Sequence, residues 1–303
     1  MKRFVSRGLF AKSFVTVPAC MHGSHPKYLK GRDLQRLSMV EEVEIKAAES
    51  MCDASADHQV WSKADVADVP ITHKRCEGIV DTTAYAAVRL MRWAFDTFSG
   101  YRFGTISERK VLNRIVFLET VAGVPGMVAG MLRHMRSLRK LQRDQGWIHT
   151  LLEEAENERM HLLTFLEVQK PSIMFRAAVL ITQGIFFNWF FIMYCISPRF
   201  CHRLVGYLEE EAVVTYTAIL QHIDDGHLPQ FAAAKCPHLA KSYWKLPEEA
   251  TFRDLILMVR ADEAGHRLVN HTFADMHQKH FEHHTHPFVV TDDVTPAKGP
   301  PQN

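Results

Sequence analysis

Two Glu-x-x-His patterns occur in the chain, Glu158 with His161 and Glu263 with His266. Residues three apart are neighbours on a helix, so each pattern places a carboxylate and an imidazole on one helix face. A chain with 18 histidines also forms such pairs by chance. The residues around each pair must therefore decide what it does.

Two further glutamates complete an ordered set. Glu119 stands alone in the apolar segment 115–132, and Glu209 lies in Leu208-Glu209-Glu210-Glu211-Ala212. The resulting order is Glu, Glu-x-x-His, Glu, Glu-x-x-His, and a di-iron bundle takes these groups from four helices. Carboxylates can bridge two metal ions, and neutral imidazoles suit iron. The complete order indicates a dinuclear metal site.

Each part of this set has an ordinary alternative. Glu158 alone could form a salt bridge, His161 could be a satisfied core histidine, and the acidic triplet at Glu209 could be a solvated face. Two rival groups are weaker. The Asp224/His227 pair lies in a polar connection that reads as a turn or helix end. The histidines of the C-terminal tail lack a preorganised site; they are His280, His283, His284 and His286.

The elements that must position these residues are helices. Strand patterns are nearly absent, and glycines and prolines such as Gly100, Pro171 and Pro198 divide the chain into helical segments. Pro125 should kink or loosen the second segment because it lacks an N–H group. The sequence therefore predicts an all-α fold with six helices, at about 81–99, 107–143, 146–170, 172–197, 199–225 and 248–284.

The ends of the chain differ from this helical part. Residues 1–25 have the composition of a mitochondrial transit peptide, because the first 32 residues hold seven basic and no acidic side chains. A basic tail that contacts nucleic acid or lipid is the alternative. Without those seven charges the formal net charge of +2 becomes about −5, so we expect no nucleic-acid partner. Residues 26–78 are predicted to be an arm, 79–285 the helical domain and 286–303 a disordered tail.

The six cysteines include no Cys-x-x-Cys pair and no compact framework. This usage fits a compartment in which thiols stay reduced. We therefore expect no structural disulfide.

One segment raises the question of a membrane. Residues 177–198 carry no formal charge over 22 positions, between Arg176 and Arg199. That length can span a bilayer, but polar residues interrupt it. The alternative is a monotopic arrangement, with apolar faces in one leaflet and arginines at the headgroups. The residues alone leave both open. The basic side chains that could hold headgroups are Arg133, Arg136, Arg139, Lys140 and Arg143.

Four motifs give the sequence a close resemblance to the alternative oxidases. They are Leu118-Glu119-Thr120, Asn157-Glu158-Arg159-Met160-His161-Leu162, Leu208-Glu209-Glu210-Glu211-Ala212 and Arg260-Ala261-Asp262-Glu263-Ala264-Gly265-His266. The resemblance covers most of residues 73–275, and the short arm and leader are similar to those of protist members. It implies a ferritin-like di-iron four-helix bundle with two additional membrane-associated helices. The implied activity is oxidation of ubiquinol by dioxygen to give water, without proton pumping.

The resemblance also implies partners and site residues. We expect two iron ions, a homodimer, and monotopic attachment to the matrix side of the mitochondrial inner membrane. The implied iron ligands are Glu119, Glu158, His161, Glu209, Glu263 and His266. Tyr216, seven residues after Glu209 and on the same helix face, is the implied catalytic relay.

Further implied residues surround the metals and the substrate. Those expected to fix the ligands by hydrogen bonds are Asn157, His202, Trp244 and Asp262. Those expected to form the quinol pocket are Arg92, Asp96, Arg114, Leu118, Leu208, Glu211, Ala212 and Thr215. The regulatory cysteines of plant members cannot be aligned with Cys52 or Cys76.

Two other functions remain open at this point. Another di-iron oxygen enzyme, such as a plastid-type quinol oxidase or a quinone hydroxylase, would share the ligand set. A metal-free membrane scaffold could carry the same carboxylates along a proton path. Iron content separates the scaffold from the enzymes.

Overall fold

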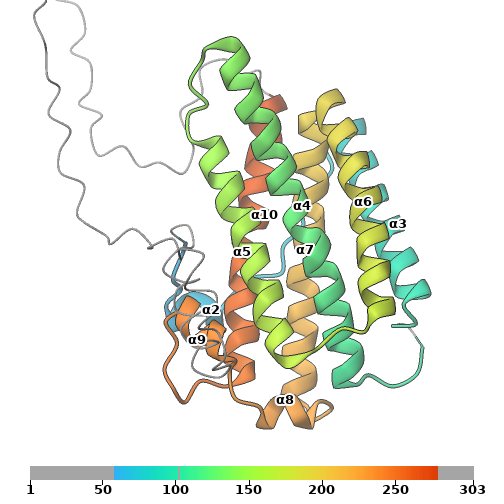
Figure 1. The fold of residues 1–303 in the computed structure, drawn as a ribbon, viewed down its shortest axis with the longest axis vertical. Helices are drawn as coiled ribbons and strands as arrows, with labels where there is room; N and C mark the ends of the chain where they lie inside the picture. The colour runs from blue at the N-terminus through green and yellow to red at the C-terminus, as the bar shows by residue number, and fades with distance from the viewer. Residues whose placement is uncertain (1–57, 102, 279–303) are drawn as a thin grey trace, which may run out of the picture. The chain divides into compact units, whose positions relative to one another are not determined.

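The computed structural model describes residues 58–101 and 103–278, and these residues are almost entirely helical (Figure 1). The predicted all-α fold is confirmed. In the described part no strand occurs beyond one isolated bridge between Lys235 and Thr251. Six long helices form, within a few residues of the expected ranges: α3 (Ile79–Phe98), α4 (Glu108–Lys140), α5 (Trp147–Val168), α6 (Ile173–Ile196), α7 (Pro198–Asp224) and α10 (Phe252–Gln278).

Four of these helices form the central bundle. The most extensive contacts are between α7 and α10 and between α4 and α5. Helix α3 packs on α7, and α6 packs on α4 and α7, so these two helices lie together on one side of the bundle (Figure 1). This arrangement matches the expected bundle with two additional helices.

Helix ends follow local sequence signals. The Ser172 hydroxyl accepts a hydrogen bond from the Phe175 N–H at the start of α6, and Ser197 caps α7 in the same way. Pro198 follows as the first residue of α7, where its missing N–H costs nothing. Ser197 is thus the single residue between α6 and α7.

Helix α4 continues through Pro125 without a break in its helical backbone. The next residue, Gly126, lies against α5 so closely that a Cβ atom there would sit 2.6 Å from the Leu151 carbonyl oxygen. This glycine therefore sets the close approach of α4 and α5, the helices that carry Glu119 and Glu158.

The sequence pattern gave no bounds for three short helices. They are α2 (Lys63–Ala67), α8 (Pro229–Ala233) and α9 (His238–Tyr243). Helix α2 falls in the predicted arm, where Ser62 and Asp65 form a capping box. The arm is bonded to the bundle, because Arg260 donates to the Val66 carbonyl and Arg267 to the Pro70 carbonyl. The predicted transit peptide and C-terminal tail lie outside the described residues.

Helix α6 differs from the other long helices in its exposure. Of its residues only Phe190 and Tyr194 are buried. Helices α4 and α6 are both long and apolar enough to cross a membrane. Half of the most apolar stretch of α4 is buried in the bundle, whereas only 11% of the corresponding stretch of α6 is buried. Helix α6 therefore exposes most of its apolar side chains.

Candidate metal centre

The structure brings all six predicted ligands together in the centre of the bundle. Each of the four central helices contributes, and every one of the six side chains is buried. Their atoms form two groups, each with ligand atoms within 4.8 Å of one another. The first group is Glu119, Glu158, His161 and Glu263; the second is Glu158, Glu209, Glu263 and His266.

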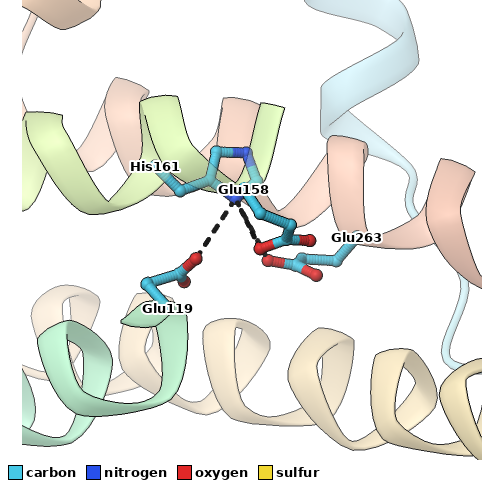
Figure 2. A group of neighbouring side chains, drawn as sticks. All are labelled: Glu119, Glu158, His161 and Glu263. Carbon is cyan, nitrogen blue, oxygen red and sulfur yellow. Dashed lines mark ion pairs between the residues drawn. The ribbon is translucent and has the colours of Figure 1, made fainter. Parts of the chain in front are cut away.

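Two carboxylates, Glu158 and Glu263, belong to both groups. Figure 2 shows them side by side below the His161 ring, with Glu119 approaching from α4. A carboxylate can bind one metal ion through each oxygen. The arrangement therefore offers two neighbouring metal positions with two shared acids.

The ligand atoms converge without satisfying one another. His161 Nδ1 lies 3.5 Å from Glu119 Oε2 and 3.4 Å from Glu263 Oε1 (Figure 2). His266 Nδ1 lies 2.8 Å from Glu158 Oε1, yet neither atom makes a hydrogen bond of acceptable geometry. Both Glu158 oxygens, Glu119 Oε2 and His161 Nδ1 are likewise buried without a hydrogen bond. Buried polar atoms are normally paired, so this donor set fits metal ions at its centre.

Electrostatics leads to the same conclusion. Burial raises the pKa of Glu119 to about 8 against the opposing effect of His161. Burial and the neighbouring Glu263 raise the pKa of Glu209 well above its ordinary value. Burial alone would raise the pKa of Glu158, but the nearby His161 and His266 rings outweigh it and hold that pKa below its ordinary value. Four carboxylates this close need cations to be ionised together.

Asp262 fixes the orientation of His161. Its Oδ2 atom lies 3.0 Å from His161 Nε2 and accepts from Trp244 Nε1 at 2.9 Å and Asn157 Nδ2 at 3.1 Å. The Trp61 indole of the arm donates to the other oxygen at 2.5 Å. Asp262 therefore holds the His161 ring with Nε2 toward its own carboxylate and Nδ1 toward the cluster, where Nδ1 could bind a metal ion.

Of the four residues predicted to hydrogen-bond the ligands, three lie around His161 and one, His202, lies elsewhere. Asn157 and Trp244 bond to Asp262, which in turn lies against His161. His202 contacts no ligand: its ring lies 3.0 Å from the Tyr194 hydroxyl and 3.1 Å from Asn270 Oδ1. Trp61 was not predicted, because the arm has no periodicity that would single it out.

Tyr216 lies against the cluster on α7. Its buried hydroxyl donates a hydrogen bond to Glu119 Oε1. Burial, and then the charge of Glu119, raise the pKa of the phenol well above its ordinary value. The hydroxyl therefore keeps its proton near neutral pH.

An apolar cavity of about 380 Å³ leads to the cluster between α3, α4, α6 and α7. It reaches Tyr216 and three of the ligands, Glu119, Glu209 and Glu263. Seven of the eight residues predicted for the quinol pocket line it: Arg92, Arg114, Leu118, Leu208, Glu211, Ala212 and Thr215. The eighth, Asp96, bonds to Arg114 instead.

Charged side chains at this cavity are held by partners. Arg92 Nη1 donates to Glu211 Oε2 at 2.5 Å and to Thr215 Oγ1 at 3.2 Å. Its Nε atom is 3.6 Å from Asp96. The wall residues that the sequence did not indicate are mostly apolar and include Met91, Phe95, Phe117, Thr182 and Phe186.

Of the rival sites, only the Asp224/His227 pair lies in the described residues. Asp224 is exposed and bonded to Arg253, away from the cluster. The histidines of the tail lie outside the described residues. Glu210 points away from the metal ligands but is buried rather than solvated, bonded to His73, Lys74 and His271. The four cysteines in the described residues are free.

A four-helix bundle with a buried cluster of four carboxylates and two histidines defines a metalloprotein of the dinuclear carboxylate class. Comparison with known proteins gives the family. The family model for alternative oxidase matches residues 61–275. The chain belongs to the alternative oxidase family, and it is an oxidoreductase of the ubiquinol oxidase class.

Individual members of this family are similar to the chain over most of its length. The mitochondrial alternative oxidase of Trypanosoma brucei brucei is 56% identical over 257 residues, which are 85% of this chain and 78% of that protein. Those of Aspergillus niger and Yarrowia lipolytica are 50% and 52% identical over 73% of this chain. The matched region is 66% and 65% of these two fungal proteins.

Proposed function

We propose that the chain holds two iron ions in the buried cluster and uses them to reduce dioxygen to water with electrons from ubiquinol. The observation that carries this proposal is the convergence of unpaired carboxylate and imidazole atoms at the end of an apolar cavity. The proposed ligands are Glu119, Glu158, His161, Glu209, Glu263 and His266. When bound, the iron ions supply the redox chemistry, which protein side chains alone do not provide.

The cavity suits a quinol. Its apolar walls can hold a ring, and the guanidinium groups of Arg92 and Arg114 offer fixed donors to a ring oxygen. Arg114 is itself held by Asp96 and lies over the Phe95 ring, 5.1 Å from its centroid. Both arginines are thereby oriented before substrate enters, and this lowers the entropy cost of binding.

Tyr216 connects the substrate to the metals in this proposal. It lines the cavity, and its hydroxyl donates a hydrogen bond to Glu119. A proton or an electron leaving the quinol therefore reaches the cluster by a short path along Tyr216. Since quinol oxidation and oxygen reduction meet at one end of one cavity, no separate path for pumped protons is required.

The proposed location follows from the relatives and from α6. The curated relatives named above are mitochondrial alternative oxidases. We place the chain at the matrix side of the mitochondrial inner membrane, with α6 in one leaflet. A homodimer is supported by a second exposed apolar row on α4, formed by Met127, Met131, Met135 and Leu138.

The deciding experiment is oxygen uptake by purified protein in detergent, with and without cyanide. Iron is measured in the same sample. We expect about two irons per chain and cyanide-insensitive uptake with a ubiquinol analogue. Preference for a plastoquinol analogue would favour the plastid-type oxidase, and a hydroxylated quinone product would favour a hydroxylase. A folded preparation with far fewer than two irons and no uptake would favour the scaffold.

A further inference from the structure

A second buried polar chain lies beside the metal ligands without belonging to them. It runs from Tyr194 on α6 through His202 on α7 and Asn270 on α10 to Glu154 on α5. All four side chains are buried, and the least covered, Glu154, is only 6% exposed. None of the four is a proposed metal ligand or a residue of the proposed quinol pocket.

The direction of each hydrogen bond in this chain can be deduced. Asn270 Nδ2 lies 2.9 Å and 3.0 Å from the two Glu154 oxygens and 3.1 Å from the His266 carbonyl oxygen. These partners are acceptors, so the amide nitrogen, with its two donors, must face them. Asn270 Oδ1 then faces His202 and accepts from Nδ1.

The direction of the last hydrogen bond, between Tyr194 and His202, follows from the protonation of His202. Burial holds the pKa of His202 well below its ordinary value, so the ring is neutral and carries one proton. With that proton on Nδ1, Nε2 is an acceptor for the Tyr194 hydroxyl at 3.0 Å. Every donor in the chain therefore points toward Glu154, and such a chain stabilises negative charge on that carboxylate.

Glu154 has no cationic partner of its own. Among the described residues no ion pair includes it, and its bonded partner Asn270 is neutral. Burial raises the pKa of Glu154 to about 7, an effect that the charge of His266 and the Asn270 hydrogen bond oppose. A buried carboxylate is costly unless a positive charge compensates it.

Glu154 lies close to the metal ligands of two helices. Glu154 precedes Glu158 by four residues and so shares its helix face. Asn270 follows His266 by four residues and donates to its carbonyl oxygen. The contact between Glu154 and Asn270 thus joins α5 and α10 one helical turn from a ligand on each helix.

We propose that Glu154 is a fifth acidic residue of the metal centre, which binds no metal ion directly but supplies negative charge beside the second group of ligands. Asn270, His202 and Tyr194 hold its carboxylate in place. The inference rests on the proposed iron site. It follows from the charge balance, because two iron ions in the ferric state would carry more positive charge than the four carboxylates of the cluster neutralise. Glu154 is a positioning residue, since it acts through the metal centre rather than on substrate.

The test is Glu154→Gln in the iron-loaded full chain, because glutamine keeps the shape and one acceptor for Asn270. Two quantities are measured: the rate at which a chelator removes iron, and the reduction potential of the centre by redox titration. We expect iron loss about 10-fold faster, the size of effect usual for groups that support ligands. We also expect a more positive potential, because a negative charge that favours the oxidised metals is gone.

The matched control is Glu156→Gln on the same helix, where the carboxylate is paired with Arg159 at the surface. It should change neither quantity. Tyr194→Phe, at the far end of the chain, should shift both in the same direction as Glu154→Gln but by less. Circular dichroism confirms that each variant is folded.

The outcomes separate the two proposals. Wild-type iron retention and potential in Glu154→Gln would overturn the role of Glu154 while the iron site stands. Equal iron loss in Glu154→Gln and Glu156→Gln would also overturn it, since a general loss of stability would then explain both. Wild-type protein that binds no iron would instead refute the proposed function.

Discussion

Glu158 and Glu263 are the two residues shared by both groups of ligand atoms. Replacing either by alanine should abolish oxygen uptake, because one substitution removes a ligand from both metal positions at once. Iron per chain should fall toward zero in both variants. Uptake and iron content are measured on the same preparations. Substantial activity in Glu158→Ala or Glu263→Ala would contradict the ligand assignment.

Adjacent glutamates on α7 should behave differently. Glu209 is a proposed ligand, whereas Glu210 accepts hydrogen bonds from the Lys74 N–H at 2.7 Å and lies 2.9 Å from His271 Nε2. Glu210→Gln should retain iron but lower the free energy of unfolding by about 1–3 kcal/mol, as removal of buried charged acceptors does. Glu209→Gln should lose iron. Equal iron loss in the two variants would show that the helical phase is wrong.

The Glu210 contribution should also depend on pH. Hydrogen bonds with His271, Lys74 and His73 outweigh burial and hold the pKa of Glu210 below its ordinary value. A lowered pKa in the folded state means that the stabilisation is present above the unfolded pKa and is lost as pH falls through the folded one. The stability difference between wild type and Glu210→Gln, measured by urea unfolding, should therefore shrink below pH 4. A difference that grows on acidification would exclude this explanation.

Residue types and spacing were enough to single out Glu158, His161, Glu263 and His266, because Glu-x-x-His fixes a helix face. Glu119 and Glu209 followed from the order of motifs that a di-iron bundle requires and from the family resemblance. Residue types and spacing were not enough for Trp61, Glu154 and Asn270. A tryptophan in an aperiodic arm carries no signal, and one more glutamate four residues before Glu158 looks like any solvated helix residue. The burial of Glu210 was missed for the same reason: partners such as Lys74 and His271 are distant in sequence.

At the scale of elements, the long helices could be predicted because prolines and glycines separate them. The segment between α7 and α10 could not, since its short helices depend on tertiary contacts. Phe231 and Tyr243 are buried, and the Cys236 N–H donates to the Ala250 carbonyl. Helices of five or six residues are not stable by themselves, and packing rather than periodicity determines them.

The packing of α4 on α5 gives a test at this scale. Gly126→Ala would place a Cβ atom 2.6 Å from a backbone oxygen of α5, which cannot move aside as a flexible side chain can. We expect a loss of about 1–3 kcal/mol, typical of overpacking. Gly184→Ala on α6 is the control, because nothing lies within 4 Å of its Cβ position. It should be neutral or stabilise by up to about 1 kcal/mol. Thermal unfolding of both variants measures the difference, and equal melting temperatures would refute the close approach.

For the whole molecule, the leader and the bundle should be separable. The predicted transit peptide supplies no proposed ligand, so deletion of residues 1–25 should leave the purified enzyme active. The same deletion should prevent mitochondrial import in cells. Fractionation and protease protection measure the import. Normal import of the shortened chain would show that the targeting signal lies elsewhere.

The membrane attachment of the whole molecule depends on α6. Arg176 is exposed near its start, as a cation at lipid headgroups should be. Arg199, which follows the other end of α6, instead donates to the buried Asp81 carboxylate at 2.9 Å and ties α7 to α3. The ends of α6 are better marked by Ile173 and Ile196, which are 82% and 71% exposed.

These two positions decide between one leaflet and a span. Single cysteines at Ile173 and Ile196, in a background without reactive native cysteines, are treated with an impermeant thiol reagent in right-side-out and inverted inner-membrane vesicles. A helix lying in one leaflet keeps both ends at the matrix face, so both should react only in inverted vesicles. The 24 residues of α6 are long enough to cross the bilayer, and a spanning helix would react at one end from each side. That second pattern would refute the monotopic attachment and leave the metal site unaffected, because α6 contributes none of the proposed ligands.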